Sequence, residues 1–116
     1  MRLAAVSTVL AIAALAATAS PAAASYHRCS IGNQGGYHVT YVTGIEVSHV
    51  SCSTGRRVVR AYHKCARANG VRGRCHHRVL HYRCTDKRGY GKGQFTGVVT
   101  CTRGHRRVRH TYEQFT

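Results

Sequence analysis

The sequence predicts a small α+β domain, in which one helix packs on a mostly antiparallel sheet and disulfides staple the fold in the order β-α-β-β-β. Three observations favour this fold class. One segment repeats apolar residues at helical spacing, and several others partly alternate apolar and polar residues as strands do. Six cysteines accompany few aliphatic side chains in a chain of 116 residues. A chain of this length forms one domain.

The predicted strands are rich in Val, Ile, Tyr and Thr. The first covers residues 37–42 and 45–50, and Gly44 marks a bulge or a turn between them. The later strands are residues 79–84, 95–102 and 106–113. Residues 85–94 are predicted as a long loop, and residues 103–105 as a tight turn between the last two strands.

The helix is predicted over residues 52–68, where apolar side chains recur every three or four positions. Candidate N-caps, Ser51 and Ser53, stand at its start. Asn69 and Gly70 provide a stop signal after its end. Laid across one face of the sheet, this helix buries the apolar faces of both elements.

Residues 1–24 have the pattern of a secretory signal peptide, with Arg2 before an apolar stretch and three alanines at the cleavage site. Cleavage leaves residues 25–116 as the mature domain, with 17 Lys and Arg against 3 acidic residues. The alternative is an uncleaved membrane anchor, which polar interruptions of the apolar stretch disfavour. We therefore expect a secreted, extracellular protein without a membrane span after signal removal.

All six cysteines follow the signal, and an even number in a short exported chain predicts disulfides rather than free thiols. A helix over residues 52–68 separates Cys52 from Cys65 by about 20 Å, so these two do not pair. A strand returning toward the helix start brings Cys84 to Cys52, and its hairpin partner carries Cys101 to the other end. The predicted pairs are Cys52–Cys84, Cys65–Cys75 and Cys29–Cys101.

Four runs carry a resemblance to small exported proteins of actinobacteria. They are GIEVSHVSC, GRRVVRAYHKC, VLHYRC and FTGVVTCTRGHRRVRHTYEQ, within residues 44–114. The runs consist of structural cysteines and strand or helix patterning. The resemblance implies a secreted, cysteine-containing α+β domain and assigns no catalytic residue.

The strongest functional signal is cationic. On the predicted helix, four basic residues fall on one solvent-facing stripe with a fifth beside it, and three more follow the last turn. The predicted anion-binding residues are Arg56, Arg57, Arg60, Lys64, Arg67, Arg106, Arg107 and Arg109. They predict non-catalytic binding of a polyanion or anionic surface, such as a wall polymer, nucleic acid or acidic polysaccharide. The alternative is a solvated face that serves solubility alone.

A second function class is a small secreted hydrolase, most plausibly ribonuclease-like, because histidines and cations are plentiful. No pair of residues is singled out by spacing, and only three carboxylates are present, so we name no catalytic residue and favour a protein that is not an enzyme. No metal or cofactor is expected either. In an extended segment His77 and His81 lie about 13 Å apart, and Cys75 is expected in a disulfide.

Overall fold

The computed structural model describes residues 13–14, 25–32 and 40–116. Nearly all of the predicted signal peptide and residues 37–39 of the first predicted strand lie outside these ranges. The elements are β1 (His27–Cys29), β2 (Thr40–Ser48), α1 (Cys52–Ala68), β3 (Arg83–Gly91), β4 (Gln94–Arg103) and β5 (Arg106–Phe115). Nowhere in the described part of the chain is a helix long and apolar enough to cross a membrane.

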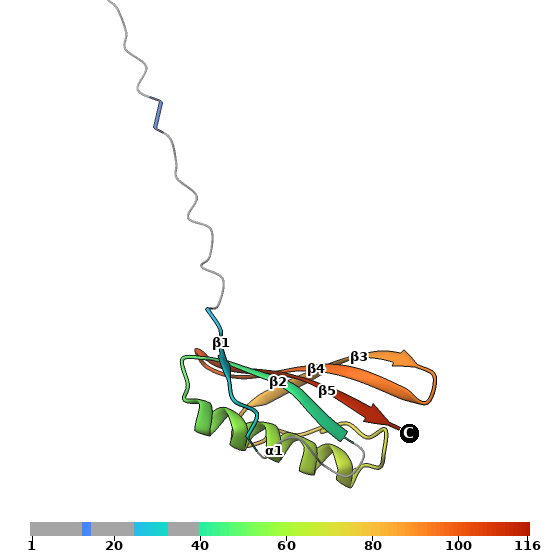
Figure 1. Cartoon of the computed structure of the whole chain (residues 1–116). Coiled ribbons are helices and arrows are strands. Elements are labelled where there is room, and N and C mark those ends of the chain that lie inside the picture. Colours follow the sequence, from blue (N-terminus) through green and yellow to red (C-terminus); the bar gives the residue numbers. More distant parts are fainter. Residues whose placement is uncertain (1–12, 15–24, 33–39) are drawn as a thin grey trace, which may run out of the picture.

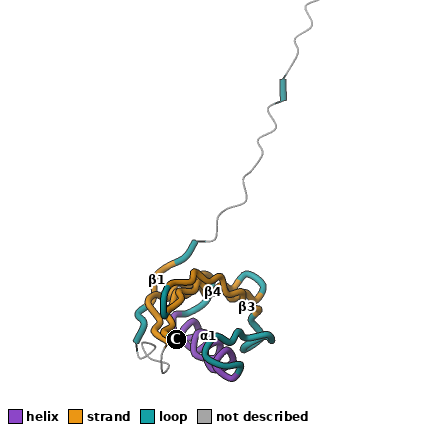
Figure 2. The backbone as a smooth tube through the Cα atoms, turned by 90° about the vertical axis from the view of Figure 1, so that its right-hand side faces the viewer, coloured by secondary structure: helices purple, strands orange, loops and turns teal. Residues whose placement is uncertain are grey.

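The predicted fold class is confirmed. The five strands form one antiparallel sheet in the spatial order β1-β2-β5-β4-β3. The helix α1 lies against one face of this sheet, as Figures 1 and 2 show from two directions. The long elements follow the order β-α-β-β-β, and the three-residue strand β1 adds an edge beside β2. The predicted irregularity at Gly44 is a register shift between Val42 and Gly44.

The helix has the predicted bounds because its capping residues act as expected. The Ser51 side chain accepts a hydrogen bond from the Thr54 backbone N–H, and the Asn69 backbone N–H bonds the carbonyls of the last turn. A Cβ on Gly55 would lie 2.5 Å from Val47 Cγ1, so glycine at this position lets the helix approach β2 closely. The core lies between helix and sheet. Its fully buried members include Ile45, Val47, Val58, Val59, Val99, Cys101 and Val108.

The predictions for residues 79–94 are wrong in two respects. Residues 79–82 form a tight turn closed by hydrogen bonds between Val79 and Tyr82, and the strand begins only at Arg83. Residues 85–91 are not a loop, because they pair in register with β4 as far as Gly91 opposite Gln94. Alternate residues of β3 do turn toward the helix side, but they include Asp86 and Arg88, whose side chains are 2% and 3% exposed. Inward-facing charges of this kind hide the strand from hydropathy patterns.

The three disulfides are Cys29–Cys52, Cys65–Cys75 and Cys84–Cys101. The predicted local pair between residues 65 and 75 is confirmed, and the other two predicted pairs are wrong. Cys84 and Cys101 are direct partners in the β3–β4 ladder, so their Cα atoms lie 4.0 Å apart. Cys29 on β1 instead lies over the start of α1 and bonds to its first residue. Three disulfides indicate an oxidising environment for the folded chain.

Candidate anion-binding site

The predicted anion-binding residues do not form one surface. Along the helix, Arg57, Arg60, Lys64 and Arg67 are exposed, whereas Arg56 is half-buried and donates to the Ser30 carbonyl at 3.2 Å. On β5, side chains alternate between the two faces of the sheet, and those of His110 and Tyr112 contact residues of the helix. The side chains of Arg107 and Arg109 therefore lie on the opposite face of the sheet.

Arg109 is also engaged within the protein. Its Nη2 lies 2.6 Å from Glu46 Oε2, and its guanidinium stacks over the Tyr26 ring at 4.3 Å. Glu46 offsets part of the charge of Arg109, and Tyr26 covers one face of its guanidinium. Arg107 and Arg109 are thus separated from the helix stripe by the thickness of the sheet.

A cleft of about 590 Å³ does bring part of the two predicted clusters together. It lies where the start of α1 meets the turn between β4 and β5. Its arginines come from α1 and from both strands of the β4–β5 hairpin, and no acidic residue lines it within residues 40–116. The lining residues are His49, Val50, Ser51, Thr54, Arg57, Leu80, His81, Tyr82, Arg103 and Arg106. We call this the basic cleft.

The β4–β5 turn places two of its arginines directly opposite each other. Arg103 pairs with Arg106 across the ladder, and Gly104 turns the chain with a φ of 58°. Like charges directly opposite each other in a sheet repel and destabilise the pair unless a counter-charge is present. Together with Arg57 from the helix, these residues create a positive field in the basic cleft that no lining carboxylate offsets.

Unusual backbone conformations concentrate at the same place. Among the described residues, three that are not glycine have a positive φ, namely His49 at 56°, Leu80 at 48° and His81 at 67°. All three line the basic cleft. Such conformations cost about 1–3 kcal/mol each and cluster at functional sites. The turn conformation at residues 80 and 81 places the residue His81 on the wall of the basic cleft.

The first turn of α1 contributes to the same field. Its orientation presents the positive end of the helix dipole to the basic cleft, and it contains no acidic residue. The exposed residues Arg60, Lys64 and Arg67 extend the positive charge along the helix beyond Arg57. From residue 57 to residue 67 this stripe covers about 15 Å.

A buried polar network under the other end of the helix was not predicted. Asp86 Oδ2 accepts hydrogen bonds from Tyr62 OH at 2.6 Å, Tyr112 OH at 2.7 Å and Arg88 Nε at 3.1 Å. Burial, with the adjacent Asp86 carboxylate, raises the pKa of both tyrosines, so they remain neutral donors. An inward-facing Asp-x-Arg on a strand opposite two buried tyrosines is the only sequence signal of this network.

Two histidines next to this network could suggest acid–base chemistry, but their geometry does not suit it. His63 and His110 hydrogen-bond to each other between Nε2 atoms 2.8 Å apart, and burial lowers the pKa of both. A cavity of about 400 Å³ reaches His63, Arg67 and Tyr112, and most of its surface is apolar. An acid and a base for phosphate cleavage must flank the phosphate rather than contact each other.

Comparison with known proteins adds no relative. No family model, curated protein or solved structure matches this chain. The resemblance to small exported actinobacterial domains therefore stays a prediction. The basic cleft is described from its own residues alone.

Proposed function

We propose that the chain is an exported, non-catalytic domain that binds anionic polymers, with the basic cleft as its primary contact. The observation that carries this proposal is the meeting of Arg57, Arg103 and Arg106 with two histidines in a cleft without a lining carboxylate. Cations that face one another without a counter-charge favour an anionic ligand. The three disulfides support export by the predicted signal peptide, because such bonds persist in oxidising compartments.

A polymer suits this surface better than a single small anion. The exposed stripe of Arg60, Lys64 and Arg67 continues from the basic cleft along the helix. A ligand with repeated negative charges contacts both at once, whereas a lone phosphate reaches only one of them. Nucleic acid, an anionic wall polymer and an acidic polysaccharide share this repeated charge.

The experiment compares two triple variants that remove the same charge. Arg57→Gln/Arg103→Gln/Arg106→Gln empties the basic cleft of arginine. The control variant is Arg83→Gln/Lys87→Gln/Arg107→Gln. It removes three cations from the face of the sheet that points away from the helix, as the alternation of exposed and inward-facing residues along β3 and β5 shows. Binding to heparin and to duplex DNA is measured over a range of salt concentrations.

We expect the cleft variant to lose more than tenfold in affinity and the control variant to lose far less. Each lost phosphate contact on duplex DNA reduces the slope of log affinity against log salt by about 0.9. Equal losses in both variants would contradict a specific site, and an affinity independent of salt would contradict electrostatic binding. Cleavage of RNA by the oxidised protein, abolished by His49→Ala or His81→Ala, would instead support the hydrolase alternative.

A further inference from the structure

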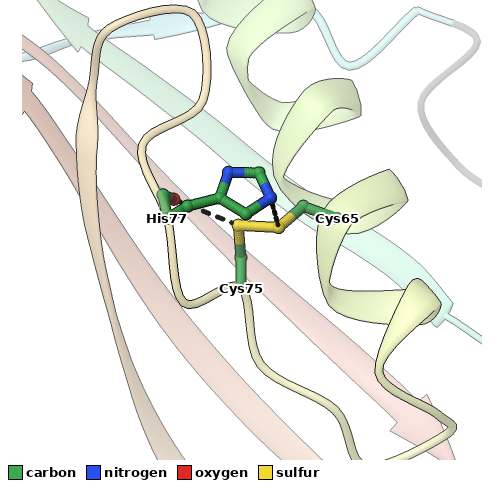
Figure 3. A group of neighbouring side chains, drawn as sticks. All are labelled: Cys65, Cys75 and His77. Carbon is green, nitrogen blue, oxygen red and sulfur yellow. Dashed lines mark hydrogen bonds between the residues drawn. A yellow bond between two sulfur atoms is a disulfide. The ribbon is translucent and has the colours of Figure 1, made fainter.

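The disulfide between the last turn of α1 and the following loop has a histidine beside it. His77 Nε2 lies 3.2 Å from Cys65 Sγ, and the ligand atoms of Cys65, Cys75 and His77 are all within 4.8 Å of one another. Figure 3 shows the imidazole facing the disulfide. Both cysteines are half-buried and His77 is exposed, so solvent reaches the group.

The histidine is oriented as a metal-ligating imidazole usually is. Its Nδ1 lies 2.9 Å from the Arg78 carbonyl oxygen, which can only accept a hydrogen bond. Nδ1 therefore carries the proton, and the lone pair of Nε2 faces the sulfur atoms. In most metal sites a backbone carbonyl or carboxylate fixes the ligating histidine in this way.

We propose that reduction of the Cys65–Cys75 disulfide converts this group into a metal site that binds a thiophilic ion such as Zn²⁺ through two thiolates and His77 Nε2. In the oxidised chain the sulfur atoms are bonded to each other and carry no thiolate charge, so the site is closed. The proposal is independent of anion binding, because none of the three residues lines the basic cleft.

The reduction step balances with a dithiol as the reductant. The dithiol gives two electrons and two protons, the Sγ–Sγ bond breaks, each sulfur takes up one proton, and the dithiol becomes a disulfide. Binding of the ion then releases both thiol protons to solvent. The product has three protein ligands and one open position, which tetrahedral zinc accepts.

The loop that carries Cys75 is held in place by contacts that do not involve the disulfide. Arg88 donates to the carbonyls of Arg72 and Gly73 at 2.8 and 2.7 Å. Asn69 Nδ2 donates to the Arg74 carbonyl at 2.6 Å, and Gln114 Nε2 donates to the Val71 carbonyl at 2.8 Å. Reduction therefore leaves both thiols close together on a fixed scaffold, which lowers the entropic cost of binding an ion.

The ligand set selects the class of ion. Sulfur and imidazole ligands suit Zn²⁺ and Cu⁺, whereas Mg²⁺ and Ca²⁺ need oxygen ligands, and no carboxylate belongs to this group. The other two bridges are less accessible, since Cys29 is 5% exposed and Cys101 is fully buried. Cys65–Cys75 also closes the shortest segment, with a sequence separation of 10. It should be the first disulfide that a dithiol reduces.

The test uses the folded mature chain and Co²⁺ as a spectroscopic probe for the zinc site. The protein is partly reduced with a limiting amount of dithiothreitol, and the reagent is then removed under anaerobic conditions. Alkylation followed by peptide mapping identifies the reduced cysteines. Co²⁺ is titrated into oxidised and reduced protein while thiolate-to-cobalt charge-transfer absorption is followed, and Zn²⁺ displaces it in competition. His77→Ala is compared with His76→Ala, which removes the neighbouring exposed imidazole.

We expect Cys65 and Cys75 to be the first cysteines reduced, and a one-to-one Co²⁺ complex to form only after reduction. The affinity of the reduced protein for Co²⁺ should be about tenfold weaker in His77→Ala. His76→Ala should keep the parent affinity. Equal affinity of the oxidised and reduced protein, or equal weakening by the two alanine variants, would overturn the proposal. Circular dichroism of Cys65→Ser/Cys75→Ser provides the folding control, and an unfolded variant would also overturn it, because the site needs the intact scaffold.

Discussion

His63 on the helix and His110 on β5 form a buried pair whose Nε2 atoms lie 2.8 Å apart. The two side chains are 5% and 1% exposed, and their rings meet edge to face with centroids 4.9 Å apart. One Nε2 donates and the other accepts, so the accepting ring is neutral and the two rings cannot both be protonated in this arrangement. Burial lowers the pKa of His63 to about 4 and that of His110 well below its usual range.

This pair should make folding stability depend on pH. In the unfolded chain both histidines titrate near pH 6.5, so below that pH the unfolded state binds more protons than the folded state. The stabilisation is complete above pH 6.5 and declines as the pH falls toward 4, by up to about 1.4 kcal/mol per pH unit for each histidine. Urea unfolding between pH 7.5 and 4.5, with disulfides intact, measures this decline. His105→Ala on the exposed turn should leave it unchanged, and a flat profile would show that the pair does not titrate as described.

The Asp86 carboxylate should contribute strongly to the stability of the fold. Burial alone would lower the pKa of Arg88, but the adjacent Asp86 raises it overall, so this arginine stays charged beneath the helix. We expect Asp86→Asn to destabilise the fold by about 3–5 kcal/mol, because it leaves a buried charge without its partner. Thermal and urea unfolding measure the change. Glu113→Gln, at an exposed acidic position, should alter stability by less than about 0.5 kcal/mol, and a similar loss in both variants would argue against the network.

Gly97 on β4 leaves room for the ring of Tyr112. A Cβ at this position would lie 2.2 Å from Tyr112 Cε1, and the ring cannot withdraw without losing its hydrogen bond to Asp86. Gly97→Ala should therefore destabilise the protein by at least about 1–3 kcal/mol in equilibrium unfolding. Gly91→Ala is the matched control, because its nearest atom, Gln94 O, would be 3.6 Å away. Wild-type stability of Gly97→Ala would rule out this packing.

Linked peptides should reveal the disulfide pattern directly. Digestion of the non-reduced chain should release Cys29 with Cys52, Cys65 with Cys75 and Cys84 with Cys101. A peptide that joins Cys52 to Cys84 would contradict the β3–β4 hairpin, since that hairpin places Cys84 opposite Cys101. Replacing Cys84 and Cys101 together by alanine should lower the free energy of unfolding by about 3 kcal/mol, as expected for a loop of this length.

The parts of the fold that local sequence controls could be predicted. The helix bounds depend on Ser51 at one end and on Asn69 with Gly70 at the other, so they were predicted correctly. The strand β3 depends on a long-range polar network, in which Asp86 and Arg88 face inward because Tyr62 and Tyr112 bond them. Hydropathy carries no sign of such partners. The same error made two of the three predicted disulfides wrong. The register of the β3–β4 hairpin pairs Cys84 with Cys101, which leaves Cys29 to pair with Cys52.

The basic cleft could be predicted only in part. Of the eight predicted anion-binding residues, Arg57 and Arg106 line it. His49 and His81 reach it through left-handed backbone conformations that side-chain patterns do not reveal. Arg103 joins them through the short β4–β5 turn. Arg107 and Arg109 were predicted to bind anions because they follow the same turn, but alternation along β5 places them on the face of the sheet away from the helix.

The strand β3 lies at the outer edge of the sheet, with β4 as its only neighbour in the described sheet. Nine residues of open edge are a template for pairing with a second copy, which is a common start of aggregation. Its exposed side chains include Arg83 and Lys87, so two such edges approaching each other bring like charges together. The positive charge on β3 therefore opposes edge-to-edge pairing of two copies of this chain.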